Sequence, residues 1–138
     1  MNRIDLQLLA DLRVREAEVL LNNGCFEGAY YLAGYAIECA LKACIAKLIR
    51  EHEFPDKKFA NDSYTHDPER LLLLTGRKTE HAAEEQVDPL FAWSWGVVKD
   101  WSESARYAHP VVEKQALDLF AAVTDPQHGV LPWIKKSW

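Results

Sequence analysis

Glycine and proline are scarce in this chain, each occurring only 6 times in 138 residues. A sandwich or barrel of β-strands needs many tight turns, so this scarcity argues against an all-β fold. No uninterrupted apolar run approaches the ~18 residues that a membrane-spanning helix requires. The first eleven residues carry Arg3, Asp5 and Asp11, which predict the start of an amphipathic helix and not a signal peptide. We therefore expect a cytoplasmic protein that does not enter a membrane.

Basic residues are outnumbered, with 16 Lys and Arg against 21 Asp and Glu and a net charge of −5. Non-specific affinity for nucleic acid comes mainly from Lys and Arg that neutralise phosphates. This balance weighs against a general nucleic-acid coating protein and leaves a local basic cleft open. The doublets Lys57-Lys58, Arg77-Lys78 and Lys135-Lys136 are either solvated surface or parts of one rim.

Cysteines are few and odd in number: Cys25, Cys39 and Cys44. Cys39 and Cys44 are five residues apart in a predicted helix, which points them to different faces and places them beyond disulfide reach. The chain has no Cys-x-x-Cys pair and no His-x-x-x-His pair, the spacings typical of zinc sites. We expect free thiols, no metal site and no cofactor.

Apolar residues recur at intervals of three and four along most of the chain, the spacing of one helical face. No alternation of period two is present, and the length suits a single domain over residues 1–138. The fold class predicted is all-α, an antiparallel up-and-down bundle of four to five helices. The predicted helices cover residues 4–23, 26–53, 67–75, 89–107 and 110–123, with a short last piece from 125 toward 138.

Local signals set these boundaries. Gly24 suits a left-handed helix end, and the dipeptides Asp67-Pro68, Asp88-Pro89 and Asp125-Pro126 each predict an N-cap followed by proline in the first turn. Residues 54–64 are predicted to form a polar loop, and the charged residues 77–86 fit either a loop or a helical turn that begins at Thr79. Gly34, in the predicted second helix, suggests close approach by another backbone.

Glu38 and Lys42 lie one turn apart in this second helix, which is apolar on nearly every side and is therefore expected at the centre of the bundle. Two interpretations are open. They form an internal or edge ion pair in the favourable i,i+4 order. Alternatively, Glu38 is held for a partner on another helix, for which Arg106 is the candidate, because a carboxylate in a core is costly unless it is paired.

Trp93, Trp95 and Trp101 fall on the predicted fourth helix and point to more than one side of it. They predict a core contact together with the interface of a homodimer. The alternative is a platform on which bases stack, which would draw on Lys99 and Arg106 for charge.

Arg106-Tyr107-Ala108-His109-Pro110 is the constellation with catalytic potential. Arginine stabilises phosphate charge and histidine transfers protons near neutral pH, the two abilities that metal-free RNA cleavage needs. Arg106 is expected in the last turn of the fourth helix, and His109 in the corner before the fifth. The alternative is a plain corner in which Arg106 caps carbonyls and His109 is a surface residue.

The run A-Y-Y-L-A-G-Y-A-I-E-C-A-L-K-A, from Ala29 to Ala43, resembles the central helix of HEPN domains. His66 followed by Leu71-Leu72 and Trp101 followed by Arg106-Tyr107 are similar to later segments of that family. The resemblance implies an all-α domain that pairs as a dimer. It also implies a nucleotidyltransferase partner and a setting in toxin–antitoxin, defence or RNA-processing systems.

In active RNases of this family an Arg is followed by four to six residues and then a His, at a cleft between two subunits. Only two residues separate Arg106 from His109 here. The interpretation favoured is a non-catalytic module that binds a nucleotide, an RNA or a nucleotidyltransferase, with Glu38, Lys42 and Tyr107 as binding or structural polar residues. The alternative is a metal-independent endoribonuclease that uses Arg106 and His109 as catalytic residues.

Overall fold

A computed structural model describes residues 1–49 and 53–138, and these residues form helices joined by turns, with no strand among them. The all-α class is thus confirmed. The longest helices are α1 (Arg3–Asn22) and α2 (Phe26–Leu48), and α6 (Pro89–Lys99) and α7 (Glu113–Thr124) follow later in the chain. Shorter elements are α3 (Lys57–Asp62), α4 (Pro68–Leu74), α5 (Lys78–Val87), the 3-10 helix η1 (Glu103–Tyr107) and α8 (Val130–Lys135).

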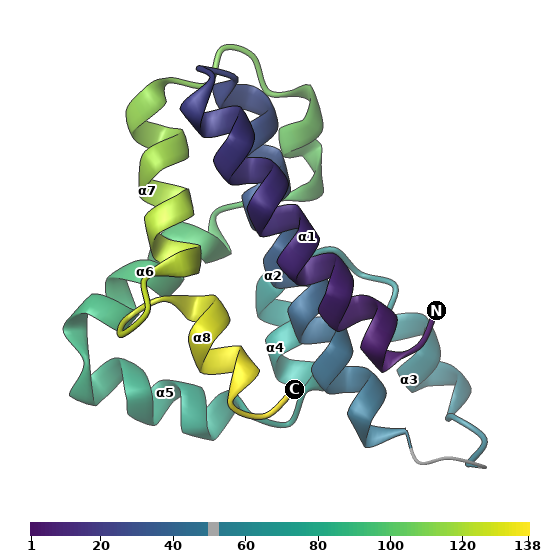
Figure 1. The fold of residues 1–138 in the computed structure, drawn as a ribbon. Helices are drawn as coiled ribbons and strands as arrows, with labels where there is room; N and C mark the ends of the chain where they lie inside the picture. Colours follow the sequence, from purple (N-terminus) through teal and green to yellow (C-terminus); the bar gives the residue numbers. More distant parts are fainter. Residues whose placement is uncertain (50–52) are drawn as a thin grey trace.

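The second helix, α2, is the centre of the molecule. It packs along α1 over most of its length and also contacts α4, α7, α8 and η1 (Figure 1). Its middle turns are apolar on nearly every side and mostly buried, as the sequence predicted. The turn between α1 and α2 passes through Gly24, whose φ of 73° is the left-handed conformation expected there.

Two Asp-Pro signals work as predicted. The carboxylate of Asp67 accepts the N–H of Glu69 at the start of α4, and that of Asp88 accepts the N–H groups of Leu90 and Phe91 at the start of α6. Asp125 instead accepts the N–H groups of Gln127 and His128 in a turn. The last helix therefore begins at Val130 and not at the third Asp-Pro pair.

Other expected boundaries are corrected. The predicted loop 54–64 contains α3, which Asp56 caps by accepting the N–H of Phe59. The undecided segment 77–86 lies largely within α5. The second helix ends at Leu48, five residues before its expected end, and residues 50–52 of that prediction lie outside the described residues.

The predicted fourth helix is interrupted at Lys99. Trp101 leaves the helix axis and turns into the core, where only 1% of its surface is exposed, and η1 follows. Its indole lies directly over Gly34, which explains the glycine: the close neighbour is a side chain and not a backbone. Trp95 is also buried within the chain, and only Trp93 is half exposed. Of the three tryptophans, only Trp93 is therefore available for the predicted homodimer interface.

The thiols are free, as predicted: Cys39 and Cys44 are buried in α2, and Cys25 is exposed. Burial raises the pKa of the Cys39 thiol to about 11 and also raises that of Cys44. Among the described residues, no helix is long and apolar enough to cross a membrane.

Candidate functional site

Five ionisable side chains, in which basic residues alternate with acids, form a continuous series, here called the charged chain: Lys42, Glu38, His66, Glu103 and Arg106. Oε1 of Glu38 accepts from Nζ of Lys42 at 2.9 Å and lies 2.8 Å from Nδ1 of His66. Nε2 of His66 lies 3.0 Å from Oε2 of Glu103. Oε1 of Glu103 lies 3.1 Å from a guanidinium nitrogen of Arg106. The series joins α2 to the segment before α4 and to η1.

The charged chain corrects the predicted contact between Glu38 and Arg106. Glu38 pairs with Lys42 and His66, and Arg106 pairs with Glu103, so His66 and Glu103 stand between them. Glu38 is 2% exposed, and among the described residues its Oε2 atom has no hydrogen-bond partner. The predicted ion pair with Lys42 is present, and the second partner of the carboxylate is His66, which lies in the loop before α4 and not on another helix.

His66 bridges two carboxylates, because Nδ1 lies against Glu38 and Nε2 lies against Glu103. The charge of the buried Glu38 carboxylate is compensated by the ammonium group of Lys42. Such compensation permits a carboxylate in the core. At the end of the series, Arg106 is engaged by Glu103.

The predicted catalytic residues lie close in sequence but contact different acids. Arg106 lies in η1 and not in the last turn of a longer helix, with its guanidinium 4.8 Å from the ring centroid of the exposed Tyr107. His109 lies in the connection before α7, as expected; its side chain is 82% exposed, and Nδ1 lies 3.3 Å from Oε1 of Glu27. Within the described part of the chain, no hydrogen bond joins Arg106 to His109.

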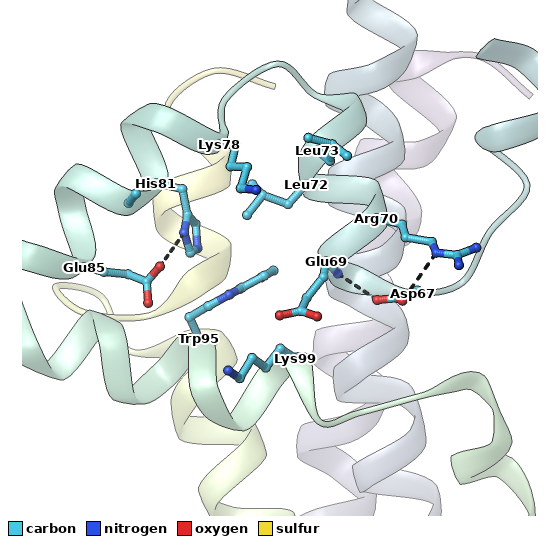
Figure 2. A pocket seen from close by; sticks show the side chains of 11 residues that line it. Asp67, Glu69, Arg70, Leu72, Leu73, Lys78, His81, Glu85, Trp95 and Lys99 are labelled. Carbon is cyan, nitrogen blue, oxygen red and sulfur yellow. Dashed lines mark hydrogen bonds and ion pairs between the residues drawn. The ribbon is translucent and has the colours of Figure 1, made fainter. Parts of the chain in front are cut away.

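A cleft of about 520 Å³ lies between α4, α5 and α6, and neither Arg106 nor His109 is among the residues that line it. Its walls include the buried side chains of Leu72, His81 and Trp95. Figure 2 shows Lys78 and Lys99 approaching this α4–α5–α6 cleft from opposite sides, with Trp95 between them. The volume is within the range of small-molecule sites, which combine an apolar lining with a few polar groups.

His81 is the buried polar group of this cleft. Its ring packs edge-on against Phe91, Trp95 and Trp133, with centroids 4.4 to 5.2 Å apart. Burial lowers the pKa of His81, against the opposing effect of Glu85, whose Oε1 lies 3.0 Å from Nδ1. In the neutral ring Nδ1–H then donates to Glu85, and Nε2 is an acceptor with no partner among the described residues.

The lowered pKa of His81 predicts a stability that falls as the pH falls. Below about pH 6.5 the unfolded chain binds a proton at this histidine that the folded chain does not, so acidification favours unfolding. We expect His81→Phe to gain stability relative to the native sequence when the pH is lowered from 7.5 to 5.5. Urea unfolding at three pH values measures this difference.

His128 provides a control of opposite sign. A hydrogen bond to Asp88, 2.7 Å from Nδ1, raises the pKa of His128, so this pair stabilises the fold fully below about pH 6.5 and less as the pH rises through the folded-state pKa. The deficit of His128→Asn should therefore shrink as the pH rises. A pH-independent difference for His81→Phe would contradict the neutral buried ring.

Sequence reasoning assigns no role to His81, names His66 only within the resemblance to HEPN domains, and does not place Lys78 beside Lys99. It treats Arg77-Lys78 only as a basic doublet, and Lys99 as a source of charge for a base-stacking platform. The available signal was weak: Asp67-Pro68 places His66 immediately before a helix cap, where a side chain can reach a neighbouring element. No local pattern indicated that Trp95 and His81 share a cleft.

Comparisons with family models, with curated proteins and with solved structures found no match for this chain. The described residues contain no group of three or more His, Cys, Asp or Glu side chains arranged to hold a metal ion.

Proposed function

We propose that this protein is a non-catalytic helical binding module that holds the phosphate-bearing part of a nucleotide or an RNA in the α4–α5–α6 cleft. The observation that carries the proposal is the pair of lysines, Lys78 and Lys99, on opposite sides of the cleft. Both are exposed, and neither forms an ion pair with any residue that the structure describes. Unpaired cations beside an aromatic wall suit a ligand with an anionic group and an apolar or planar body.

The formal charges that line the cleft balance, because Asp67, Glu69 and Glu85 stand against Arg70, Lys78 and Lys99 while the His81 ring is neutral. Asp67 caps α4 and lies 3.9 Å from Arg70, and Glu85 accepts from His81. Lys78 and Lys99 are the cations of the lining without an ion-pair partner among the described residues, so the proposal rests on these two side chains and not on a net positive charge. The acidic chain as a whole still repels polyanions, so the affinity should be modest and should fall with added salt.

The resemblance to HEPN domains extends this proposal to a partner. It points to a nucleotidyltransferase protein, in a toxin–antitoxin or defence-type system. The exposed Tyr107 and the outer end of the charged chain at Arg106 are then available as a contact surface. Co-purification with the product of a neighbouring nucleotidyltransferase gene would test this extension.

Removal of either lysine should weaken binding of a nucleotide. Hydrogen bonds to charged groups contribute about 1.5–3 kcal/mol, so Lys78→Ala and Lys99→Ala should each raise the Kd by about 10-fold or more. Isothermal titration with AMP, ATP and a short single-stranded RNA measures the affinities. Lys136→Ala, which removes an exposed lysine outside the cleft, is the matched control and should leave the Kd unchanged.

No RNA cleavage above background is expected, because the acids Glu103 and Glu27 occupy Arg106 and His109 where a phosphate would have to bind. RNA is incubated with the protein in the presence of EDTA, and His109→Ala is the comparison. Cleavage that survives chelation and is lost in His109→Ala would establish the endoribonuclease in place of the binding module. Absence of both binding and cleavage would overturn the proposed function.

A further inference from the structure

The first helix carries apolar residues on two opposite faces. Its inner face, with Ala10 and Ala17 fully buried, packs on α2. Ile4, Leu8 and Val19 are 60%, 65% and 61% exposed, and Leu12 is 36% exposed. At ~100° per residue these four and Arg15 fall within an arc of about 80°. This outer stripe of α1 lies opposite the core-facing side.

A shallow apolar hollow of about 480 Å³ adjoins the outer stripe. It is lined by Leu12, Arg15, Glu16, Val19, Leu20 and, from α2, Leu32. Its centre lies three to four residues after Leu12. The exposed Leu8 lies four residues before Leu12. The projecting side chain of Leu8 and the hollow therefore lie on either side of Leu12, at nearly equal distances from it along the helix.

This spacing fits a second copy of the same chain. When two α1 helices pack antiparallel with Leu12 opposite Leu12, Leu8 of each copy lies over the hollow of the other. Ile4, eight residues before Leu12, meets Val19, seven residues after it. A two-fold interface requires such self-complementarity, because the same patch must serve both partners.

The charges beside the stripe fit the same arrangement. In this arrangement Arg15 lies opposite the segment of the second copy between Asp5, which belongs to the capping box of α1, and Asp11, which pairs with Lys135 of its own chain. Glu18 lies on the same helix edge as Arg3, which the antiparallel arrangement brings to the same end. Arg3, Arg15 and Glu18 form no ion pair with any residue in the described ranges 1–49 and 53–138. Complementary charges of this kind set the register of an interface.

We propose that the outer stripe of α1 is a docking surface for a second copy of this chain, in an antiparallel α1–α1 contact about a two-fold axis near Leu12. Leu8 is the side chain that fills the partner's hollow. This inference rests on α1 and α2 alone and is independent of the ligand proposed for the α4–α5–α6 cleft.

Sedimentation equilibrium at micromolar concentration should show particles of twice the 15.8 kDa chain mass. Central, well-packed interface residues dominate affinity, so Leu8→Lys should raise the dimer Kd at least about 30-fold. Leu117→Lys, an exposed leucine on α7, is the matched control and should leave the dimer intact. If Leu8→Lys does not fold by circular dichroism, Arg15→Glu gives the same test, because it places like charges together.

A cross-linking experiment fixes the geometry. In a Cys25→Ser background, Leu12→Cys should give a covalent dimer with a short bis-maleimide, and Leu117→Cys should not. If the protein is still a monomer at a protein concentration of about 100 µM, the second copy is not the occupant of this face. A different protein bound at the same face would overturn the proposal as well. A dimer that Leu8→Lys and Arg15→Glu leave unchanged would show that the interface lies elsewhere.

Discussion

Substitution of Gly34 by alanine is expected to destabilise the protein by about 2–4 kcal/mol, because the added methyl group would collide with the buried indole of Trp101. A Cβ built at Gly34 would lie 2.3 Å from three atoms of that ring. The indole is 1% exposed and stacks on Tyr31, so it has no free space to move into. The gain of about 1 kcal/mol that alanine normally brings to a helix is too small to offset this.

Gly96 is the matched control for this prediction. It also lies within a helix, α6, but a Cβ built there meets nothing within 4 Å. Gly96→Ala should therefore stabilise the fold by up to about 1 kcal/mol. Urea unfolding of both variants measures the difference.

A double variant, Gly34→Ala with Trp101→Leu, tests the collision itself. It should lose less free energy of unfolding than the sum of the two single changes, since the two residues are in contact. Additive losses would contradict the collision.

Substitution of Glu38 by glutamine should be the second large effect. The carboxylate is 2% exposed and is shared by Lys42 and His66, so its neutral replacement leaves the Lys42 ammonium without its charged partner and weakens the contact with His66. Breaking a buried pair costs about 3–5 kcal/mol. We expect the lower end, about 3 kcal/mol, because Lys42 and His66 reach solvent. The Tm should then fall by about 10 °C.

Glu16→Gln is the control for Glu38→Gln. Glu16 forms an i,i+3 pair with Arg13 on α1, in which both side chains are partly open to solvent, and such solvated pairs contribute at most about 1 kcal/mol. Differential scanning calorimetry at neutral pH compares the two variants. A Glu38→Gln protein that melts within a degree or two of the native sequence would show that the charged chain does not hold α2 to η1.

Signals that act over three or four residues could be read from the sequence. Asp67 and Asp88 were identified as caps because aspartate accepts the N–H groups just after it, whatever the rest of the fold does. Asp125 forms the same kind of bonds, yet its helix begins only at Val130. There the buried side chains of the last helix fix the boundary, and such packing cannot be read locally.

The larger differences arise from contacts between residues far apart in the sequence. Helical periodicity continues through Trp101, and only the space above Gly34, 67 residues earlier, explains why the chain turns inward there. His66 meets one carboxylate 28 residues before it and another 37 residues after it. The apolar residues around Glu38 in the sequence indicate that its carboxylate is costly to bury. No local pattern, however, distinguishes His66 from Arg106 as its partner.

The three thiols allow the opening of the central helix, α2, to be measured by the rate at which its buried cysteines react. The thiolate is the form that reacts with alkylating reagents, and only Cys25 is exposed in the native state. Cys39 and Cys44 become reactive only when α2 separates from its neighbours. The rate at which a second and a third label appear thus reports how often the core opens, even in an unpurified extract, and ligand or partner binding that slows this opening becomes visible as delayed labelling.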